Sequence, residues 1–179
     1  MDAPALMALI AACAPQVDPG TARAVVQVES GGNPHAIGVV GGALVRQPRH
    51  AAEALATARA LDAGGWDFSV GLAQINRRNF DRLGLQIGTA FDPCANLAAM
   101  QAVLVECFDR AAPRAPAPDA LRQALSCYYS GDFRTGFAHG YVQRVVGAAA
   151  QRPRASRPPR PAQPPRPTRA DQPQVEDPR

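Results

Sequence analysis

The sequence predicts a mainly α-helical domain with a small β element, an α+β class, over residues 1–150, followed by a disordered Pro/Arg-rich tail over residues 151–179. Three observations support this division. Hydrophobic residues make up 46% of the 179 residues, which is enough for a packed core. Apolar residues recur at helical spacing in several runs. Beyond residue 150, nine of 29 residues are proline and seven are arginine.

The expected helices are separated by loops marked by glycine and proline. Asp18-Pro19 and Asp92-Pro93 each place a capping carboxylate before a proline suited to the first helical position. The expected helices cover residues 3–14, 19–30, 49–63, 93–111, 121–128 and 141–150. Only the segments 36–45 and 68–72 have the β-branched residues and glycines that suit short strands or a hairpin.

Charge is distributed unevenly along the chain. Residues 1–150 carry 12 arginines and 12 acidic residues, whereas residues 151–179 carry seven arginines and three acidic residues. A domain that binds nucleic acid needs a basic face to neutralise phosphates, so this class is excluded for the neutral part. The longest apolar run is too short to span a membrane.

The tail has Val175 as its only larger aliphatic residue. Such a segment buries too little apolar surface to offset the entropy of ordering it, so we expect disorder with polyproline II character. Two interpretations remain open. The tail is either an expendable solvated segment or a docking segment for a proline-binding groove or an acidic partner.

The four cysteines, Cys13, Cys94, Cys107 and Cys127, form no C-x-x-C pair, and the three histidines are scattered, so we expect neither a metal site nor a cofactor. An even number of cysteines fits two disulfides in an exported protein, and free buried thiols are the alternative. Cys107 and Cys127 fall on the core-facing sides of consecutive helices, so we pair them with each other and Cys13 with Cys94. The first arginine is Arg23, so no signal peptide with a positive start is visible.

Glu29 is the most informative residue. In the expected helix 19–30, Ala22, Val25 and Val26 stand seven, four and three residues before Glu29, so helical geometry places all four on one stripe. Desolvation by apolar neighbours raises the pKa of a carboxyl group, and a carboxyl that is protonated near neutrality can act as a general acid. On this residue alone, a structural ion pair with an arginine is the alternative.

Four motifs in order resemble those of the lytic transglycosylase family with a lysozyme-like (SLT) domain. They are Glu29-Ser30-Gly31-Gly32-Asn33-Pro34, Ser69-Val70-Gly71-Leu72-Ala73-Gln74-Ile75-Asn76, Ala124-Leu125-Ser126-Cys127-Tyr128-Tyr129-Ser130-Gly131 and Tyr141-Val142-Gln143-Arg144-Val145. The segments 36–42, 91–97 and 126–131 look most like the subfamily attached to type IV secretion and conjugation systems. Two residues depart from the family pattern: Ala73 stands where methionine is usual, and Tyr129 where asparagine is usual.

The resemblance implies a lysozyme-like fold with a β-hairpin at the active-site cleft, and a lytic enzyme of the periplasm that acts on peptidoglycan glycan strands. Glu29 would be the one catalytic residue, and the product would carry 1,6-anhydromuramoyl ends. Ser69 and Gln74 would hydrogen-bond Glu29 or the sugar N-acetyl groups, with strand-edge solvation as the alternative. Tyr128 and Tyr141 would orient Glu29 and line the sugar site, or else be core residues. Gly71 would let the chain pass close to the glycan.

Two rival functions remain. A hydrolytic muramidase would need a second carboxylate, for which Asp67 is the best candidate and Asp132 a weaker one. A peptidoglycan-binding or assembly component of a secretion system would have a vestigial cleft and would work through its tail.

Overall fold

The computed structural model describes residues 1–151 of the protein. Its helices are α1 (Ala3–Cys13), α2 (Pro19–Ser30), α3 (Ala51–Ala63), α4 (Pro93–Ala111), α5 (Ala117–Ser130), α6 (Thr135–Ala138) and α7 (Tyr141–Ala150). Its strands are β1 (Ile37–Val39), β2 (Phe68–Val70) and β3 (Ile75–Asn76), and its short 3₁₀ helices are η1 (Arg77–Asn79), η2 (Asp81–Leu83) and η3 (Ala112–Arg114). The predicted class, mainly α with a small β element, is confirmed. The tail predicted for residues 151–179 lies outside the described residues, except for Gln151.

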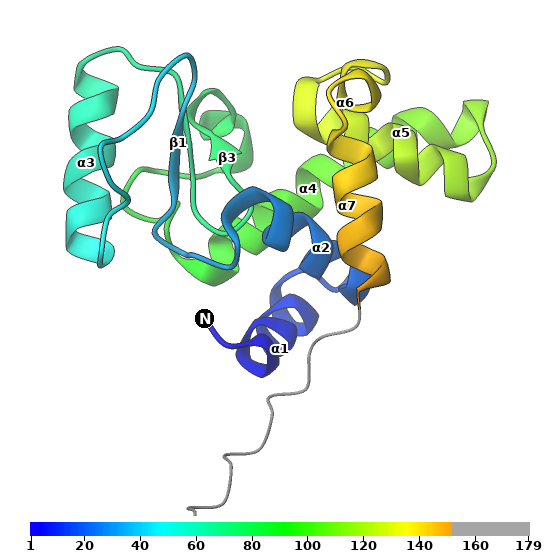
Figure 1. The fold of residues 1–179 in the computed structure, drawn as a ribbon, viewed down its shortest axis with the longest axis horizontal. Coiled ribbons are helices and arrows are strands. Elements are labelled where there is room, and N and C mark those ends of the chain that lie inside the picture. The colour runs from blue at the N-terminus through cyan, green and yellow to red at the C-terminus, as the bar shows by residue number, and fades with distance from the viewer. Residues whose placement is uncertain (152–179) are drawn as a thin grey trace, which may run out of the picture.

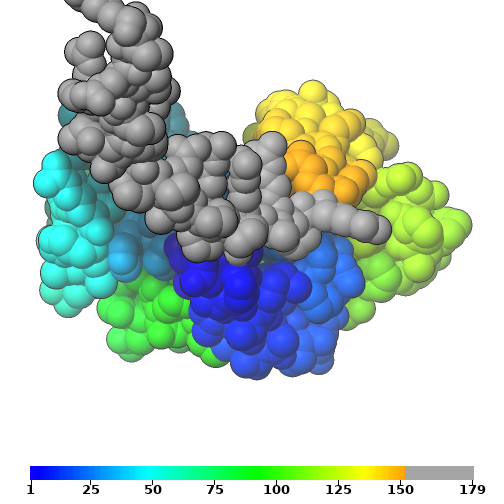
Figure 2. All heavy atoms as spheres, turned by 60° about the horizontal axis from the view of Figure 1, so that its bottom comes forward, coloured from blue at the N-terminus to red at the C-terminus, as the bar shows by residue number. Residues whose placement is uncertain are grey.

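The elements form two parts joined by α2 and α4 (Figure 1). The sheet and α3 lie on one side of the molecule, and α5, α6 and α7 lie on the other. Helix α4 packs against α5 and α1, and α2 packs against α7. Figure 2 shows the face on which α1 (blue) lies, between α3 (cyan) and α5 (light green). Within residues 1–151, no helix combines the length and the apolar character needed to cross a bilayer.

Helices α2 and α4 begin where the sequence predicts, whereas α3 begins two residues later than expected, at Ala51, and α5 four residues earlier, at Ala117. The Asp18 carboxylate accepts a hydrogen bond from the Thr21 backbone N–H at 2.8 Å, and Asp92 accepts one from Ala95 N–H at 2.8 Å. Each aspartate therefore satisfies a donor that the first turn leaves unpaired. Helix α2 ends at Gly31, whose φ of 62° is in the left-handed region that glycine adopts without strain.

The sheet is antiparallel with the order β1-β2-β3, and it pairs Gly38 with Ser69 and Ser69 with Asn76. Strand β1 is shorter than the extended segment expected over residues 36–45, since it ends at Val39. Gly41 then turns the chain with a φ of 73°. Beyond the turn, the Gln47 side-chain amide takes the place of a neighbouring strand: its Oε1 accepts from Ile37 N–H and its Nε2 donates to the Ile37 carbonyl, both at 2.9 Å.

Two disulfides link the helices of the core, with the pairing that the sequence predicts. Cys13–Cys94 joins the end of α1 to the start of α4, and Cys107–Cys127 joins α4 to α5. Neither the free-thiol alternative nor another pairing is found. The disulfides border one continuous core, in which the largest fully buried side chains include Phe68, Phe80, Leu97, Met100 and Tyr141.

Candidate active site

A cleft of about 560 Å³ lies between the sheet and the helices α4 and α5. One wall is formed by residues of β1, β2 and β3 and of the turn before β3, and the opposite wall by α4 and the end of α5. Glu29, from the last turn of α2, reaches the cleft between these walls. Residues of the first three motifs therefore meet at the cleft, and the fourth motif joins them through the hydrogen bond from Tyr141 to Glu29.

Glu29 sits at the cleft with its carboxyl group largely desolvated. Ala22, Val25 and Val26, which precede it on α2, are completely buried, as the periodicity predicts, whereas Glu29 itself is half-buried. This burial raises the pKa of Glu29 from 4.5 to about 7, against the lowering effects of a hydrogen bond from Tyr141 and of the charge of Arg144. The carboxyl group is thus close to half-protonated at neutral pH, as a group that both gives and takes a proton requires.

The hydroxyl of Tyr141 donates a hydrogen bond to Glu29 Oε1 at 2.6 Å. Tyr141 is almost fully buried, and burial together with the nearby Glu29 charge raises its own pKa far above the usual value, so it stays a donor. Among residues 1–151, no arginine forms an ion pair with Glu29, which removes the structural ion pair as an alternative for this residue. With Oε1 engaged, Oε2 is the oxygen left to carry the exchangeable proton.

The turn that connects β2 and β3 is held by side chains from three helices. Tyr128 of α5 donates its hydroxyl to the Ala73 carbonyl at 2.6 Å, and Ser30 of α2 donates to the Leu72 carbonyl at 2.7 Å. Asn96 of α4 is completely buried, accepts from Ala73 N–H at 2.8 Å, and donates to the carbonyls of Val70 and Ala90. The turn therefore has one fixed position relative to Glu29.

Gln74 ends this turn in an unusual backbone conformation. Its φ of 49° is the only positive φ of a non-glycine residue among residues 1–151. Its side-chain Nε2 donates to the carbonyls of Ala36 and Gly71 at 3.1 and 3.0 Å, which leaves Oε1 as an acceptor at the cleft. A Cβ on Gly38 would lie 2.7 Å from that oxygen, so the glycine makes room for the amide.

Ser69 and Gly71 occupy different positions relative to the cleft. Ser69 lines it, and its hydroxyl accepts a long hydrogen bond of 3.4 Å from Asn76 Nδ2. Gly71 is buried and is not among the lining residues. Its φ is 81°, and a Cβ there would lie 2.3 Å from Asn96 Nδ2. This glycine leaves room for the packing of Asn96, and its expected role at the glycan stays a prediction.

The two carboxylates considered for hydrolysis are both engaged elsewhere. Asp67 accepts from Asn76 Nδ2 at 2.8 Å and pairs with Arg78 at 3.0 Å, and it is not among the residues that line the cleft. Asp132 accepts hydrogen bonds from the Thr135 hydroxyl and from the N–H groups of Thr135 and Arg134, which lower its pKa to about 2. Asp132 thus closes a local turn at the start of α6.

Tyr129 replaces the asparagine of the family pattern with an aromatic contact. Its ring stacks on Tyr141, with centroids 4.7 Å apart and an interplanar angle of 20°, and its hydroxyl lies 3.2 Å from His139 Nδ1. Tyr129 is 41% exposed and lines the cleft. It covers one face of the tyrosine that holds Glu29.

No local pattern in the sequence marks the charged residues of the cleft other than Glu29. Arg78, Arg82 and Arg110 line it together with Glu106, whose carboxylate pairs with Arg82 at 2.6 Å. Apart from Glu29, Glu106 is the only carboxylate in the lining, within the described residues. Three or more potential metal-binding side chains do not gather anywhere in residues 1–151.

The fold and the geometry around Glu29 agree with a comparison against protein families. The model of the transglycosylase SLT domain matches residues 7–149, so the chain belongs to this family. The match includes every residue of the site described above.

A comparison with individual curated proteins finds relatives named virB1. The type IV secretion system protein virB1 of Brucella suis biovar 1 is 51% identical over 144 residues, which are 76% of this chain and 60% of that protein. Protein virB1 of Agrobacterium fabrum is 39% identical over 150 residues, which are 82% of this chain and 60% of that protein. The chain thus spans about 60% of the length of these curated relatives. No solved structure gives a significant match.

Proposed function

We propose that this chain is a lytic transglycosylase that cleaves the β-1,4 bond between N-acetylmuramic acid and N-acetylglucosamine in peptidoglycan. The observation that carries the proposal is the state of Glu29: a desolvated carboxyl with a pKa of about 7, held through one oxygen by Tyr141 at the wall of a cleft. The other carboxylate of the lining, Glu106, is neutralised by Arg82. One desolvated carboxyl group at the cleft, that of Glu29, supports a reaction in which a single residue gives and later takes the proton.

In the proposed reaction, Glu29 Oε2 donates its proton to the glycosidic oxygen as the bond from that oxygen to the anomeric carbon breaks. The acetamido group of the substrate stabilises the positive charge that develops on the sugar, a known exception to the use of two carboxylates. The 6-hydroxyl group of the same muramic acid then attacks the anomeric carbon, and Glu29 takes its proton. The result is a 1,6-anhydro ring, a free hydroxyl on the departing sugar and Glu29 restored to its acid form.

The remaining cleft residues serve position and binding in this proposal. Tyr141 fixes the direction of the Glu29 carboxyl, and Tyr128 acts on the site through the Ala73 carbonyl. Gln74 Oε1 and the Ser69 hydroxyl are available to N–H and hydroxyl groups of the sugars, since Gln74 Nε2 is already used by backbone carbonyls. Tyr129 offers an exposed aromatic ring against which a sugar can pack.

Mass spectrometry of digested glycan tests the activity. Wild-type protein should release muropeptides with anhydromuramic ends, and Glu29→Gln should abolish their release while circular dichroism shows an intact fold. Asp119→Asn, on the exposed face of α5 and outside the cleft, is the matched control and should cut like wild type. Muramic acid ends that carry an added water, without anhydro ends, would instead establish hydrolysis.

We further propose that this activity opens the cell wall in the periplasm for a type IV secretion or conjugation apparatus. The names of the Brucella and Agrobacterium relatives support this setting. The test is complementation of a strain that lacks the gene. Glu29→Gln should fail to restore secretion or conjugation. If Glu29→Gln restores it and a chain ending at residue 150 does not, the protein works through its tail as an assembly component.

A further inference from the structure

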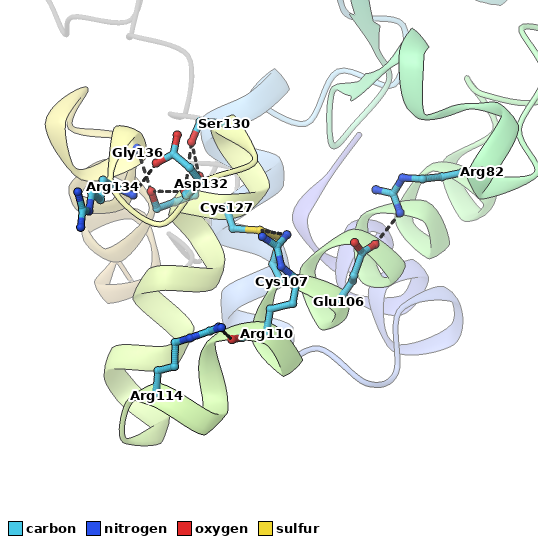
Figure 3. The surroundings of a disulfide bond; sticks show 11 residues. Arg82, Glu106, Cys107, Arg110, Arg114, Cys127, Ser130, Asp132, Arg134 and Gly136 are labelled. Atoms are coloured by element: carbon cyan, nitrogen blue, oxygen red, sulfur yellow. Dashed lines mark hydrogen bonds and ion pairs between the residues drawn. A yellow bond between two sulfur atoms is a disulfide. The ribbon is translucent and has the colours of Figure 1, made fainter.

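Three arginines on the cleft, Arg78, Arg82 and Arg110, form a surface that we call the arginine wall. Arg78 and Arg82 come from η1 and η2 after the sheet, and Arg110 comes from the last turn of α4. Figure 3 shows Arg82 directed toward Glu106, with Arg110 one turn further along α4. Residues 1–150 have equal numbers of arginines and acidic residues, so an excess of cations at one place is a local feature.

Arg110 holds a positive charge at the cleft that no carboxylate within residues 1–151 neutralises. Its Nη1 donates to Cys127 Sγ at 3.5 Å, and its Cζ lies 5.3 Å from the centroid of the Phe133 ring. The guanidinium group accordingly lies beside the Cys107–Cys127 disulfide (Figure 3). These contacts orient the side chain and leave its charge available to a ligand.

Arg82 and Arg78 are oriented by carboxylates and keep donors to spare. Arg82 pairs with Glu106 at 2.6 Å through Nη1, and Arg78 pairs with Asp67 at 3.0 Å through Nη2. A guanidinium group has five N–H donors, so each retains several. The three arginines thus have two paired carboxylates, Glu106 and Asp67, and the charge of Arg110 is the one left uncompensated within the described residues.

We infer that the arginine wall binds the carboxylates of the peptide stems that muramic acid carries, so that strands whose stems have free carboxylates are cut in preference to strands without free carboxylates. The inference rests on the proposed function, because it names a part of the same substrate. Where muramic acid carries a stem, its lactyl carboxyl is bound in an amide, so the glycan backbone is uncharged there and the free carboxylates lie on the peptides. Planar guanidinium groups bind carboxylates through paired hydrogen bonds, whereas an uncharged sugar offers no carboxylate to the unpaired Arg110.

The test compares three substrates: sacculi with intact stems, glycan strands freed of stems by an amidase and then amidated at the lactyl carboxylates that this cleavage exposes, and sacculi whose stem carboxylates have been converted to amides. Wild-type protein should cut the intact sacculi with a KM about three- to tenfold lower than the other two, at similar kcat. Arg110→Gln should remove this difference, and Arg110→Lys should restore part of it. Arg59→Gln, an exposed arginine of α3 outside the cleft, is the control and should behave like wild type.

Co-sedimentation of the Glu29→Gln protein with the same sacculi measures binding without cleavage. Equal binding to intact and amidated sacculi, or an equal loss on all substrates with Arg110→Gln, would overturn the inference. The comparison of intact with amidated sacculi uses one and the same protein, so it decides the question even where an arginine variant folds poorly. Binding that depends on the stems, without release of anhydro ends by wild type, would refute the proposed function and leave this inference standing.

Discussion

The burial of Glu29 predicts that Glu29→Gln stabilises the protein at alkaline pH. In the unfolded chain the carboxyl titrates near 4.5, whereas the folded protein raises its pKa to about 7. The folded state therefore binds the proton more tightly than the unfolded state does. The folded protein disfavours the ionised form of Glu29, so its free energy of unfolding falls as the pH rises through this range. The contribution of Glu29 to that free energy is complete below about pH 4.5 and is lost as the pH rises to 7.

The difference between a pKa of 4.5 and one of about 7 corresponds to about 3 kcal/mol of unfolding free energy, at about 1.4 kcal/mol per pKa unit. Glutamine is neutral at every pH, and its side-chain oxygen can still accept the hydrogen bond of Tyr141. The free energy of unfolding of Glu29→Gln minus that of wild type should therefore increase by about 3 kcal/mol between about pH 4 and about pH 8.

Urea unfolding of both proteins at a series of pH values measures this quantity. All other titrating groups are shared, so their contributions cancel in the difference between the two curves. The cleavage activity need not be known, because the measurement concerns only the fold. Two curves that run parallel from acidic to alkaline pH would show that Glu29 titrates normally and would refute the reasoning from burial.

Three further predictions concern the surroundings of Glu29. Tyr141→Phe removes a donor that lowers the pKa of Glu29, so the alkaline limb of the pH–cleavage profile should move up by about one pH unit; an unmoved limb in the pH–rate profile would contradict this. Asn96→Ala leaves buried backbone groups of the turn unpaired and should lower the free energy of unfolding in urea by about 3 kcal/mol or more. A loss below about 1 kcal/mol would contradict the role of Asn96 in holding the turn. Cys107→Ser combined with Cys127→Ser opens a cross-link between residues 20 apart and should lose about 3 kcal/mol by the same assay, with unchanged stability as the contrary outcome.

The features that the sequence predicts well are those that depend on local periodicity. The position of Glu29 follows from the apolar residues one and two turns before it on α2. The starts of α2 and α4 follow from Asp18 and Asp92, whose capping needs only the next three residues. The Cys107–Cys127 pairing also follows from helix faces, since both residues point from adjacent helices into one core.

The features that the sequence could not predict depend on contacts between distant segments. In the sequence Asn96 looks like an ordinary helix residue. Only the structure shows that its side chain forms hydrogen bonds with backbone groups at the turn between β2 and β3. The contact of Gly71 with Asn96 spans 25 residues and leaves no local pattern in the sequence. The arginine wall likewise joins η1 and η2 to the end of α4, which no periodicity connects. The strand expected over 36–45 ends at Val39, where the turn at Gly41 follows, and the Gln47 amide that pairs with Ile37 has no pattern in the sequence.

The turn between β2 and β3 takes its shape from Ser30, Asn96 and Tyr128, which reside on three separate helices. A displacement of any one of these helices would therefore change the shape of the turn and move Gln74 relative to Glu29. The geometry of the site thus depends on how α2, α4 and α5 pack against the sheet, and not on the turn sequence alone.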